Sequence, residues 1–499
     1  MGSGLAPARD ARPIRKGERI HVVGAGGAGA SAAALLAHYR GAAVTGCDPG
    51  GPSPYTPALE AAGIHLDWEH RAEHVAGEPS PERLGVTKAL TAVDPDNAEL
   101  VAARAAGVPV EPWQQVIADA AVGKTLVGIA GTHGKSTSAG WLVHVLAEAG
   151  LDPCAFVGAL LPSALTGGLP ATARWGAGLP FVVEADEYAG NFAAYRPDLA
   201  VLTSAEWDHP DVFADRAAVV DTFASWLGRA AGRGTRPILV ANTGDPGVVE
   251  VIERLDGWAG EVLAVRLVDP VGPAVDGAAP DYLTGTIVDA GPTGTTLVLE
   301  GRALARPLRA HLRLAGKHNA SNALGVAGAA LALGVPPEVL SQALGSFTGV
   351  GRRLERKGEG RGVVVYDDYG HHPSAIRETL AAVRQLEPGR RVWAVYEPLT
   401  YHRTAAMVDE FARVLATADA VAVAEIWASR DPDRTITSAA ALARATALLR
   451  PGLIAVAPGT VEETAEWLAG QVRSGDAVLV MGGGKSYQIA DLLLRELQA

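Results

Sequence analysis

The sequence contains very little cysteine, only Cys47 and Cys154 among 499 residues. Two cysteines supply neither a disulfide framework nor a metal cluster made of cysteines. Basic charge is also scarce, because 43 Lys and Arg residues face 55 Asp and Glu residues and leave a net charge of −12. A nucleic-acid-binding surface should be basic, so we expect no nucleic-acid partner. A phosphorylated ligand stays possible, because a few local cations and backbone N–H groups can hold it.

The sequence also lacks long apolar runs. The apolar helical segment "SAAALLAHY" (31–39) is much shorter than a membrane span, and the opening "MGSGLAPARDARP" has no apolar centre like that of a signal peptide. We therefore expect no membrane insertion and a cytoplasmic enzyme. A chain of 499 residues is too long for a single core and predicts several domains. Nothing in the sequence indicates an oligomeric state.

Short β-rich runs alternate with Ala- and Leu-rich helical patterns along the whole chain, as in "RIHVVGAGG", "TLVGIAGTHG" and "AVLVMGGG". Continuous apolar runs are typical of parallel strands buried on both faces, so the pattern predicts an α/β fold. We divide the chain into three units, 1–121, 122–346 and 347–499. Within the second unit, "YLTGTIVDAGPTGTTLVLEG" (282–301) is rich in Gly and Thr and predicts an antiparallel insertion.

A glycine-rich turn follows the first predicted strand in "HVVGAGGAGAS". Gly24, Gly26, Gly27 and Gly29 allow a tight turn and a close approach of backbone N–H groups to a diphosphate. Asp48 ends a second strand about 20 residues later, as in dinucleotide-binding folds. The motif does not distinguish NAD from a UDP-sugar, and a turn required only for helix packing is the alternative.

The segment "VGIAGTHGKSTSAG" (127–140) is similar to a phosphate-binding loop, but with a shortened spacing between Gly131 and Gly134. Lys135 supplies a cation in an exposed loop, and the Ser136 hydroxyl can bind Mg²⁺. The same Gly-Lys-Ser letters recur in "MGGGKSYQ" (481–488). We interpret that second copy as a chance match, because no carboxylate-bearing strand follows it.

Carboxylates follow the next two predicted strands. A hard cation that bridges phosphates requires oxygen ligands and tolerates an imidazole. Any single carboxylate is most often simply solvated. These residues follow a phosphate loop in chain order, however, and as a group they predict a metal site. The members of this group are Glu184, Asp186 and Glu187 in "VEADEY" and Glu206, Asp208 and His209 in "AEWDHP".

Two later segments add polar side chains. Asn319 and Asn322 are three residues apart in "KHNASNA" and share a helix face, where their amides can contact adenine or simply cap the helix. Arg352 and Arg353 in "GVGRRLE" suit a phosphate or a carboxylate, although a surface basic pair is the alternative. "YDDYGHHPS" adds a further set, Asp367, Asp368, Tyr369, His371 and His372.

In this order the motifs resemble those of the Mur ligases, ATP-dependent enzymes that form amide bonds in peptidoglycan precursors. The resemblance extends from "VVGAGGAGAS" through "AGTHGKST", "VEADEY", "WDHPD", "KHNASNA", "GVGRRLE", "DDYGHHPSAI" and "TYHRT" to "EIWASRD". It is strongest to the alanine-adding branch, and the short phosphate loop is a family feature. The resemblance implies a Rossmann-like first domain for the UDP moiety of UDP-N-acetylmuramate, a P-loop-ATPase-like central domain for ATP, and a Rossmann-like third domain that brings L-alanine.

The resemblance also implies roles for individual residues. The UDP-sugar would contact the glycine-rich turn with Ser31 and Asp48, and the amino acid would contact Tyr369, His371 and Arg403. Two Mg²⁺ ions would be held by Ser136, Glu184 and His209. The ATP site would comprise Gly131, Thr132, His133, Gly134, Lys135, Ser136, Thr137, Asn319, Asn322, Arg353 and Asp368. The catalytic group would comprise Lys135, Glu184, His209, Arg353 and His371.

Some positions depart from the alanine-adding pattern. Glu397-Pro398-Leu399 stands where Gln-Pro-His is usual, and Ser204 stands where Asn is usual. Glu-Pro is closer to the branch that attaches a preformed tripeptide, so a tripeptide ligase is the rival within the family. No lysine lies between Lys135 and Lys317, so the carbamylated lysine of several Mur ligases is excluded. Outside ligase chemistry, the rival hypotheses are a nicotinamide-dependent oxidoreductase and a non-catalytic binding protein.

Overall fold

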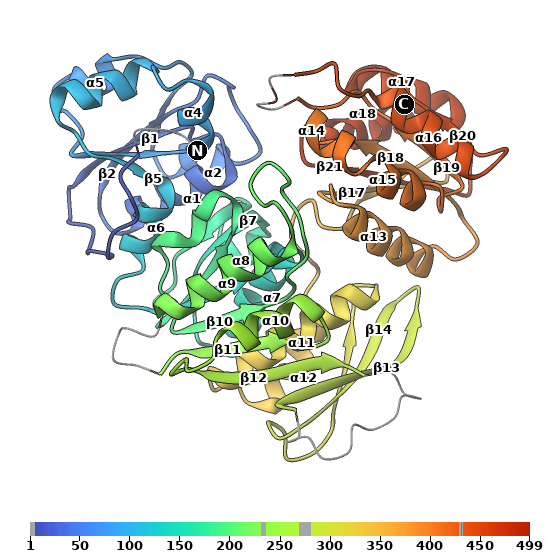
Figure 1. The fold of residues 1–499 in the computed structure, drawn as a ribbon, viewed down its shortest axis with the longest axis horizontal. Coiled ribbons are helices and arrows are strands. Elements are labelled where there is room, and N and C mark those ends of the chain that lie inside the picture. The colour runs from blue at the N-terminus through green and yellow to red at the C-terminus, as the bar shows by residue number, and fades with distance from the viewer. Residues whose placement is uncertain (1–4, 231–235, 269–280, 429–430, 432) are drawn as a thin grey trace.

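The computed structural model describes residues 5–230, 236–268, 281–428, 431 and 433–499, and its strands form three sheets. Ser429 and Arg430 of the "EIWASRD" segment lie outside the described residues. The first unit (blue) and the third unit (orange to red) form two lobes, and the middle unit (green to yellow) lies below them (Figure 1). The predicted α/β fold with three domains is confirmed, while the boundaries at 121/122 and 346/347 stay predictions.

The first sheet has five parallel strands in the order β3-β2-β1-β4-β5. This order is that of a doubly wound nucleotide-binding fold, in which ligands lie beyond the carboxyl ends of the strands. Its elements are β1 (Arg19–Val23), α1 (Ala28–Tyr39), β2 (Ala43–Cys47), α2 (Pro57–Ala61), β3 (His65–Asp67), α3 (Glu73–Ala76), β4 (Arg83–Val86), α4 (Lys88–Val93), α5 (Ala98–Ala106), β5 (Val110–Pro112) and α6 (Trp113–Ala120).

The second sheet has ten strands in the order β15-β14-β13-β12-β11-β10-β6-β9-β7-β8. Its elements are β6 (Thr125–Ala130), α7 (Lys135–Glu148), β7 (Cys154–Leu161), α8 (Ser163–Thr166), β8 (Ala171–Arg174), β9 (Pro180–Ala185), the 3-10 helix η1 (Tyr188–Ala194), β10 (Leu199–Leu202), α9 (Arg216–Ala230), β11 (Ile238–Asn242), α10 (Pro246–Arg254), β12 (Glu261–Leu267), β13 (Leu283–Gly291), β14 (Gly294–Glu300), β15 (Leu308–Leu312), α11 (Lys317–Ala332) and α12 (Pro337–Ser346).

The glycine- and threonine-rich segment 282–301 forms the antiparallel pair β13 and β14, as predicted. It is not a separate insertion, because β13 pairs in parallel with β12 and thereby extends the large sheet. β15 continues the antiparallel edge by pairing with β14. The central strands β6, β9 and β10 are parallel, which puts their carboxyl ends at one edge.

The third sheet has six strands in the order β16-β17-β21-β18-β19-β20, and all pairs except β16–β17 are parallel. Its elements are β16 (Glu355–Gly360), β17 (Val363–Asp368), α13 (Pro373–Leu386), β18 (Arg391–Glu397), α14 (Tyr401–Ala406), α15 (Val408–Leu415), β19 (Ala420–Val423), α16 (Ala439–Leu449), β20 (Ile454–Val456), α17 (Val461–Gln471), β21 (Asp476–Gly482) and α18 (Ser486–Gln498). Among the described residues, no helix combines the length and the apolar character needed to cross a bilayer.

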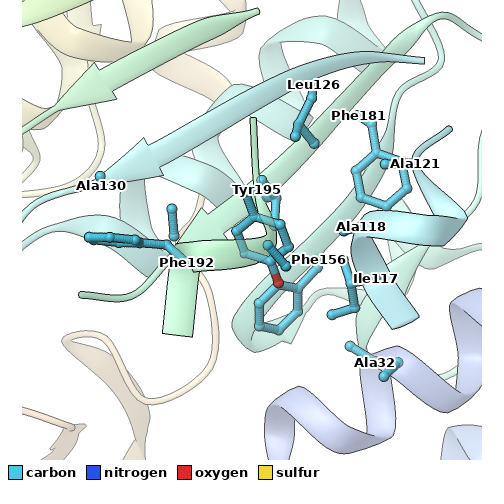
Figure 2. Packing of buried hydrophobic residues seen from close by; sticks show 14 of the residues in the cluster. Ala32, Ile117, Ala118, Ala121, Leu126, Ala130, Phe156, Phe181, Phe192 and Tyr195 are labelled. Carbon is cyan, nitrogen blue, oxygen red and sulfur yellow. The ribbon is translucent and has the colours of Figure 1, made fainter. Parts of the chain in front are cut away.

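The first two units share one apolar core, whereas the third unit has cores of its own. Figure 2 shows Ile117 of α6 beside Phe156, and Ala121, just after α6, beside Phe181 of the middle sheet. Apolar burial of this kind stabilises by about 25 cal/mol per Å² removed from water. The first two units are therefore expected to move as one body.

Candidate functional site

The site is a cavity of about 940 Å³ at which all three units meet. The first unit contributes the glycine-rich turn, the middle unit contributes the phosphate loop and the start of α11, and the third unit contributes the end of β17 and the loop before α18. These segments lie at the carboxyl ends of parallel strands or at the first residues of helices. In α/β folds, ligands bind beyond the carboxyl ends of the strands. A ligand in this cavity would contact residues that are hundreds of positions apart.

The phosphate loop connects β6 to α7 and turns sharply at two glycines. Gly131 has φ 132° and Gly134 has φ 81°, values that side chains with a Cβ atom rarely adopt. A Cβ atom on Gly134 would lie 2.4 Å from Asn322 Oδ1, so the loop fits closely against α11. The first residues of α7, Lys135 to Thr137, line the cavity, and the N-terminus of a helix is a favourable site for an anion.

Lys135 begins α7 and is not an exposed loop cation, contrary to the expectation from the sequence. Its side chain is 13% exposed, and its Nζ lies 2.9 Å from Oε2 of the buried Glu187. Nζ also donates to the carbonyl oxygens of Gly131 at 2.7 Å and Thr132 at 3.3 Å. Although burial alone would lower the pKa of Lys135, the charges of Glu187 and Asp186 raise it, so the ammonium stays charged.

The Ser136 hydroxyl connects the middle unit to the third unit. It donates to Glu184 Oε1 at 2.9 Å, and Arg353 Nη2 from the third unit donates to the same Ser136 oxygen at 2.9 Å. Glu184 Oε2 accepts the N–H of Gly158 at 2.7 Å, which holds the carboxylate in place. Arg353 is therefore no surface cation, because it reaches the head of the phosphate-loop helix.

The remaining loop residues are fixed by the segment after β10. Thr132 and Glu206 exchange two hydrogen bonds of 3.0 Å, both between the Thr132 hydroxyl and the Glu206 backbone. His133 donates its backbone N–H to Ser204 Oγ at 3.0 Å, and its Nε2 lies 2.8 Å from Glu206 Oε2. Ser204 thus holds the loop at the position where Asn is usual. Thr137 lies one residue into α7 beyond Ser136 and lines the cavity.

His209 was expected to bind a cation, and its nitrogen lies within 4.8 Å of oxygen atoms of Asp186 and Glu187. Its Nδ1, however, lies 2.9 Å from Nη2 of Arg403, which can only donate. The neutral ring then carries its proton on Nε2, so His209 must turn or give up this contact before it binds a cation. Arg403 also pairs with Asp208 Oδ1 at 2.8 Å. The donor set fits a hard cation, and His209 fits after this rearrangement.

Arg403 was expected to contact the amino-acid substrate. It is buried and absent from the cavity lining, although its Nη1 has no hydrogen-bond partner among the described residues. A substrate carboxylate would supply that missing acceptor if the loop around α14 shifts. The assignment of Arg403 stays a prediction.

Asn319 and Asn322 lie in the first turns of α11 and line the cavity beside the phosphate loop. Neither caps the helix, because Gly316 is the capping residue and no side chain caps α11. Asn319 Nδ2 donates to the Ala315 carbonyl at 2.8 Å, and Asn322 Nδ2 donates to Asn319 Oδ1 at 3.3 Å. The capping alternative is thus wrong, and the contact with adenine stays a prediction.

Four of the predicted residues, Asp368, Tyr369, His371 and His372, line the cavity from the end of β17 and the loop after it. Asp368 accepts the N–H groups of Leu354 and Gly370, both at 2.7 Å, and burial raises its pKa. The Tyr369 ring lies 4.8 Å from the Arg353 guanidinium carbon. His371 donates from Nδ1 to the Tyr369 carbonyl at 3.0 Å, which leaves Nε2 as an acceptor.

The glycine-rich turn of the first unit is only partly in the cavity. Gly26, Gly27 and Gly29 line it, whereas Gly24, Ser31 and Asp48 do not. Asp48 supports the turn, because its Oδ2 accepts the Gly26 N–H at 2.9 Å.

Gly29 and Ser31 also take part in packing. A Cβ atom on Gly29 would lie 2.2 Å from the Trp113 ring, so this glycine permits α1 to approach α6. Ser31 is fully buried and lies 2.9 Å from Thr172 Oγ1 of the middle unit. Packing explains Gly29 and Ser31 well, and their contact with a UDP-sugar stays a prediction.

The second Gly-Lys-Ser segment also lies at the cavity, contrary to its interpretation as a chance match. Gly483, Gly484 and Lys485 line the cavity wall at the head of α18. The amide of Ser486 donates to Oε2 of the buried Glu397 at 2.7 Å, so a carboxylate of the protein holds the position of a bound anion. Glu397 lies in the motif that departs from the alanine-adding pattern.

Glu397 predicts a pH dependence of stability. Burial raises the pKa of Glu397 from 4.5 to about 7, although the amides of Ser486, Lys485 and Gly484 and the charge of Arg352 oppose the rise. The folded protein then binds this proton more tightly than the unfolded chain does, so the free energy of unfolding falls as the pH rises from 4.5 to about 7. Glu397→Gln should remove this part of the dependence, as measured by denaturant unfolding across that range.

The exposed Glu496 of α18, the helix whose Ser486 amide Glu397 accepts, provides the control. Glu496→Gln should leave the dependence of the wild-type protein unchanged. Equal pH dependence in the wild-type protein and in Glu397→Gln would contradict the assignment.

Two cavity residues gave no signal in the sequence. Tyr55 lines the cavity from a loop, and Trp113 lines it from the start of α6. A single aromatic residue in a loop has no distinguishing spacing, so only the fold identifies it.

Three stretches of the chain match known families. Residues 19–125 match "Mur ligase family, catalytic domain", residues 129–330 match "Mur ligase middle domain", and residues 352–484 match "Mur ligase, glutamate ligase domain". A UDP-N-acetylmuramate–L-alanine ligase of Gloeobacter violaceus is 35% identical over 489 residues, 97% of each chain. One from Arthrobacter sp. is 38% identical over 432 residues, 86% of this chain and 85% of that one.

Solved structures share the fold. A UDP-N-acetylmuramate–alanine ligase (MurC) of Thermotoga maritima has a TM-score of 0.76 and 24% identity, covering 96% of this chain and 98% of that one. A murein peptide ligase (Mpl) of Psychrobacter arcticus has a TM-score of 0.71 and 22% identity, covering 96% and 99%. With sequence similarity over almost its full length and three matching domains in order, the chain belongs to the Mur ligase family.

Proposed function

We propose that the protein is an ATP-dependent ligase that joins L-alanine to the carboxylate of UDP-N-acetylmuramate, a cytoplasmic step in peptidoglycan precursor synthesis. One observation carries the proposal. The Ser136 hydroxyl at the head of the phosphate-loop helix contacts Glu184 and Arg353, which ties two units together where a terminal phosphate would lie. The curated relatives named for this reaction support the choice of substrates.

The reaction requires activation, because a carboxylate and an ammonium do not condense in water. The sugar carboxylate attacks the terminal phosphorus of ATP, the bond to ADP breaks, and an acyl phosphate forms. The amine nitrogen of alanine then attacks the acyl carbon, and the bond to phosphate breaks. Lys135 and Arg353 offset the repulsion between the triphosphate and the carboxylate.

Residues of the site suit a hard cation. Ser136, Glu184 and His209 would hold up to two Mg²⁺ ions, and Mg²⁺ when bound would neutralise negative charge on the phosphates. The closely spaced oxygen atoms of Ser136 and Glu184, 2.9 Å apart, fit such a ligand set.

His371 suits proton transfer from the amine. Burial and the charge of Arg403 hold its pKa well below the ordinary value, so the ring is neutral near pH 7. Its Nδ1–H is committed to the Tyr369 carbonyl, and its free Nε2 can accept the proton that the alanine ammonium must lose.

An acceptor comparison tests the proposal. Phosphate release that depends on ATP and UDP-N-acetylmuramate should be faster with L-alanine than with L-alanyl-γ-D-glutamyl-diaminopimelate, and mass spectrometry should detect the alanine adduct. The tripeptide is the second candidate acceptor, because Glu397 stands where the alanine-adding pattern has Gln. A product only with the tripeptide would overturn the choice of L-alanine and keep the ligase chemistry.

A nicotinamide-dependent oxidoreductase is one rival outside ligase chemistry. It leaves the phosphate loop and its carboxylates without a role. Saturable NADH binding in a spectral titration would revive it.

A further inference from the structure

A second cluster of metal-binding side chains lies in the first unit, apart from the cavity. His21, Cys47, His74 and Glu99 each bring a ligand atom within 4.8 Å of the others. They come from two neighbouring strands of the first sheet, β1 and β2, and from the helices α3 and α5. None of the four lines the cavity, so the ligase reaction does not account for them.

The ligand atoms lie close to one another, most of them closer than the ligands of a tetrahedral zinc site. Zinc bonds of about 2.0–2.3 Å put neighbouring ligand atoms roughly 3.3–3.8 Å apart. Cys47 Sγ lies 3.1 and 3.2 Å from the two Glu99 oxygens, and His21 Nε2 lies 3.6 Å from Glu99 Oε1. The His74 Nδ1 atom is in hydrogen-bond contact with the same Glu99 oxygen. Zinc binding therefore requires these side chains to move apart around the ion.

His21 provides independent evidence for a ligand. Its side chain is 2% exposed, and among the described residues its Nε2 makes no hydrogen bond, because Glu99 Oε1 lies just beyond hydrogen-bond distance at 3.6 Å. The other nitrogen, Nδ1, lies 2.8 Å from Thr45 Oγ1. A buried imidazole nitrogen without a partner costs free energy unless something else, such as a metal ion, satisfies it.

The surroundings orient the ligands as zinc sites require. His74 turns its second nitrogen, Nε2, to Asp67 Oδ2 at 3.1 Å, the carboxylate–histidine arrangement that supports metal-bound imidazoles. Glu99 is fully buried and, within the described part of the chain, pairs with histidines and with no Lys or Arg. Its charge therefore lacks a permanent cation, which a divalent ion would supply.

We propose that the first unit binds one Zn²⁺ ion through four side chains, His21, Cys47, His74 and Glu99. A set of two imidazoles, one thiolate and one carboxylate favours zinc over magnesium, which prefers oxygen ligands. Four protein ligands leave no open position, as in structural zinc sites. The ion holds β1 and β2 to α3 and α5, directly beside the glycine-rich turn, whose Gly24 and Ala25 amides donate to the Cys47 carbonyl.

The test uses the full-length protein, freed of metal with a chelator and then titrated with Zn²⁺ or Co²⁺ in excess Mg²⁺. We expect one tightly bound Zn²⁺ per chain and a higher melting temperature. The Co²⁺ form should show the charge-transfer band of a thiolate–cobalt bond. Cys47→Ser should lose that band, whereas Cys154→Ser, which changes the other buried cysteine, should keep it.

A variant of Asp67, which contacts His74, tests the site through a partial loss of zinc affinity. Asp67→Asn removes the carboxylate behind His74 and should lower zinc affinity by about 10–100-fold without removing the thiolate band. If the folded wild-type protein neither retains Zn²⁺ nor shows the band, the proposal is wrong, whatever the variants do. It is equally wrong if Cys47→Ser binds zinc as tightly as the wild-type protein does.

Discussion

Replacing Lys135 with alanine should lower the rate of amide formation by about 10³-fold or more, the usual range for a cation that stabilises charge in phosphoryl transfer. In the proposed reaction a triphosphate meets a carboxylate, and Lys135 is the cation of the phosphate loop. The measurement is single-turnover formation of the amide, which separates chemistry from product release.

The burial of Lys135 beside Glu187 also predicts an effect of this variant on stability. Glu187 is 2% exposed and pairs with Lys135, so the variant leaves a buried carboxylate without its cation. We therefore expect Lys135→Ala to be less stable than the wild-type protein, and the double variant Lys135→Ala/Glu187→Gln to regain stability but not activity. That separation distinguishes lost catalysis from lost folding.

Lys485 offers a matched comparison, since it belongs to the second Gly-Lys-Ser segment and is exposed. Lys485→Ala should reduce the rate far less than Lys135→Ala does. Equal losses in the two variants would refute the assignment of the first loop as the phosphate-binding one.

Replacing Arg83 with methionine should lower the free energy of unfolding by about 3–5 kcal/mol, the range for removing one partner of a buried ion pair. Arg83 is 1% exposed and faces three carboxylates, with Nε 3.0 Å from Glu18 Oε1 and Nη1 2.9 Å from Glu111 Oε2. Asp119 is the third carboxylate. Arg9 also contacts Glu111 and Asp119, but it is partly exposed and cannot fill the space that Arg83 leaves.

Denaturant unfolding measures this loss, and Arg15→Met is the control. The Arg15 side chain is 66% exposed, so its pairs are worth only about 0–1 kcal/mol. A loss at Arg83 no larger than that at Arg15 would show that the network does not stabilise the fold.

The Arg83 loss should depend on pH. Although burial opposes it, hydrogen bonds from Arg12 and Arg15 and the charge of Arg83 lower the pKa of Glu18 from 4.5 to about 2. A lowered pKa contributes stability above pH 4.5 that is lost as the pH falls toward about 2. The difference between the wild-type protein and Arg83→Met should therefore shrink over that range.

The sequence predicted the α/β fold and the phosphate loop because both depend on local patterns. Apolar runs mark buried parallel strands, and Gly131 and Gly134 mark a turn that only glycine adopts readily. Glu184 was predicted near the loop because parallel strands end at one edge of a sheet. Its contact with Ser136 agrees with that reasoning.

Other features could not be predicted because they depend on distant contacts. Arg353 and Ser136 are 217 positions apart, and no spacing rule links them. The burial of Lys135 depends on Glu187, and the zinc-site geometry of His21 and Cys47 depends on how four elements meet. Packing, rather than local propensity, decides each of these.

The loop at the head of α18 shows how such contacts determine the use of a motif. Glu397 is tethered beside the Ser486 amide by its position at the end of β18. A tethered carboxylate has a high effective concentration there, with which a dissolved phosphate must compete. Two loops with the same Gly-Lys-Ser letters therefore differ in their availability to a ligand. Glu397 competes with a phosphate at the loop before α18, whereas the loop before α7 is left to the nucleotide.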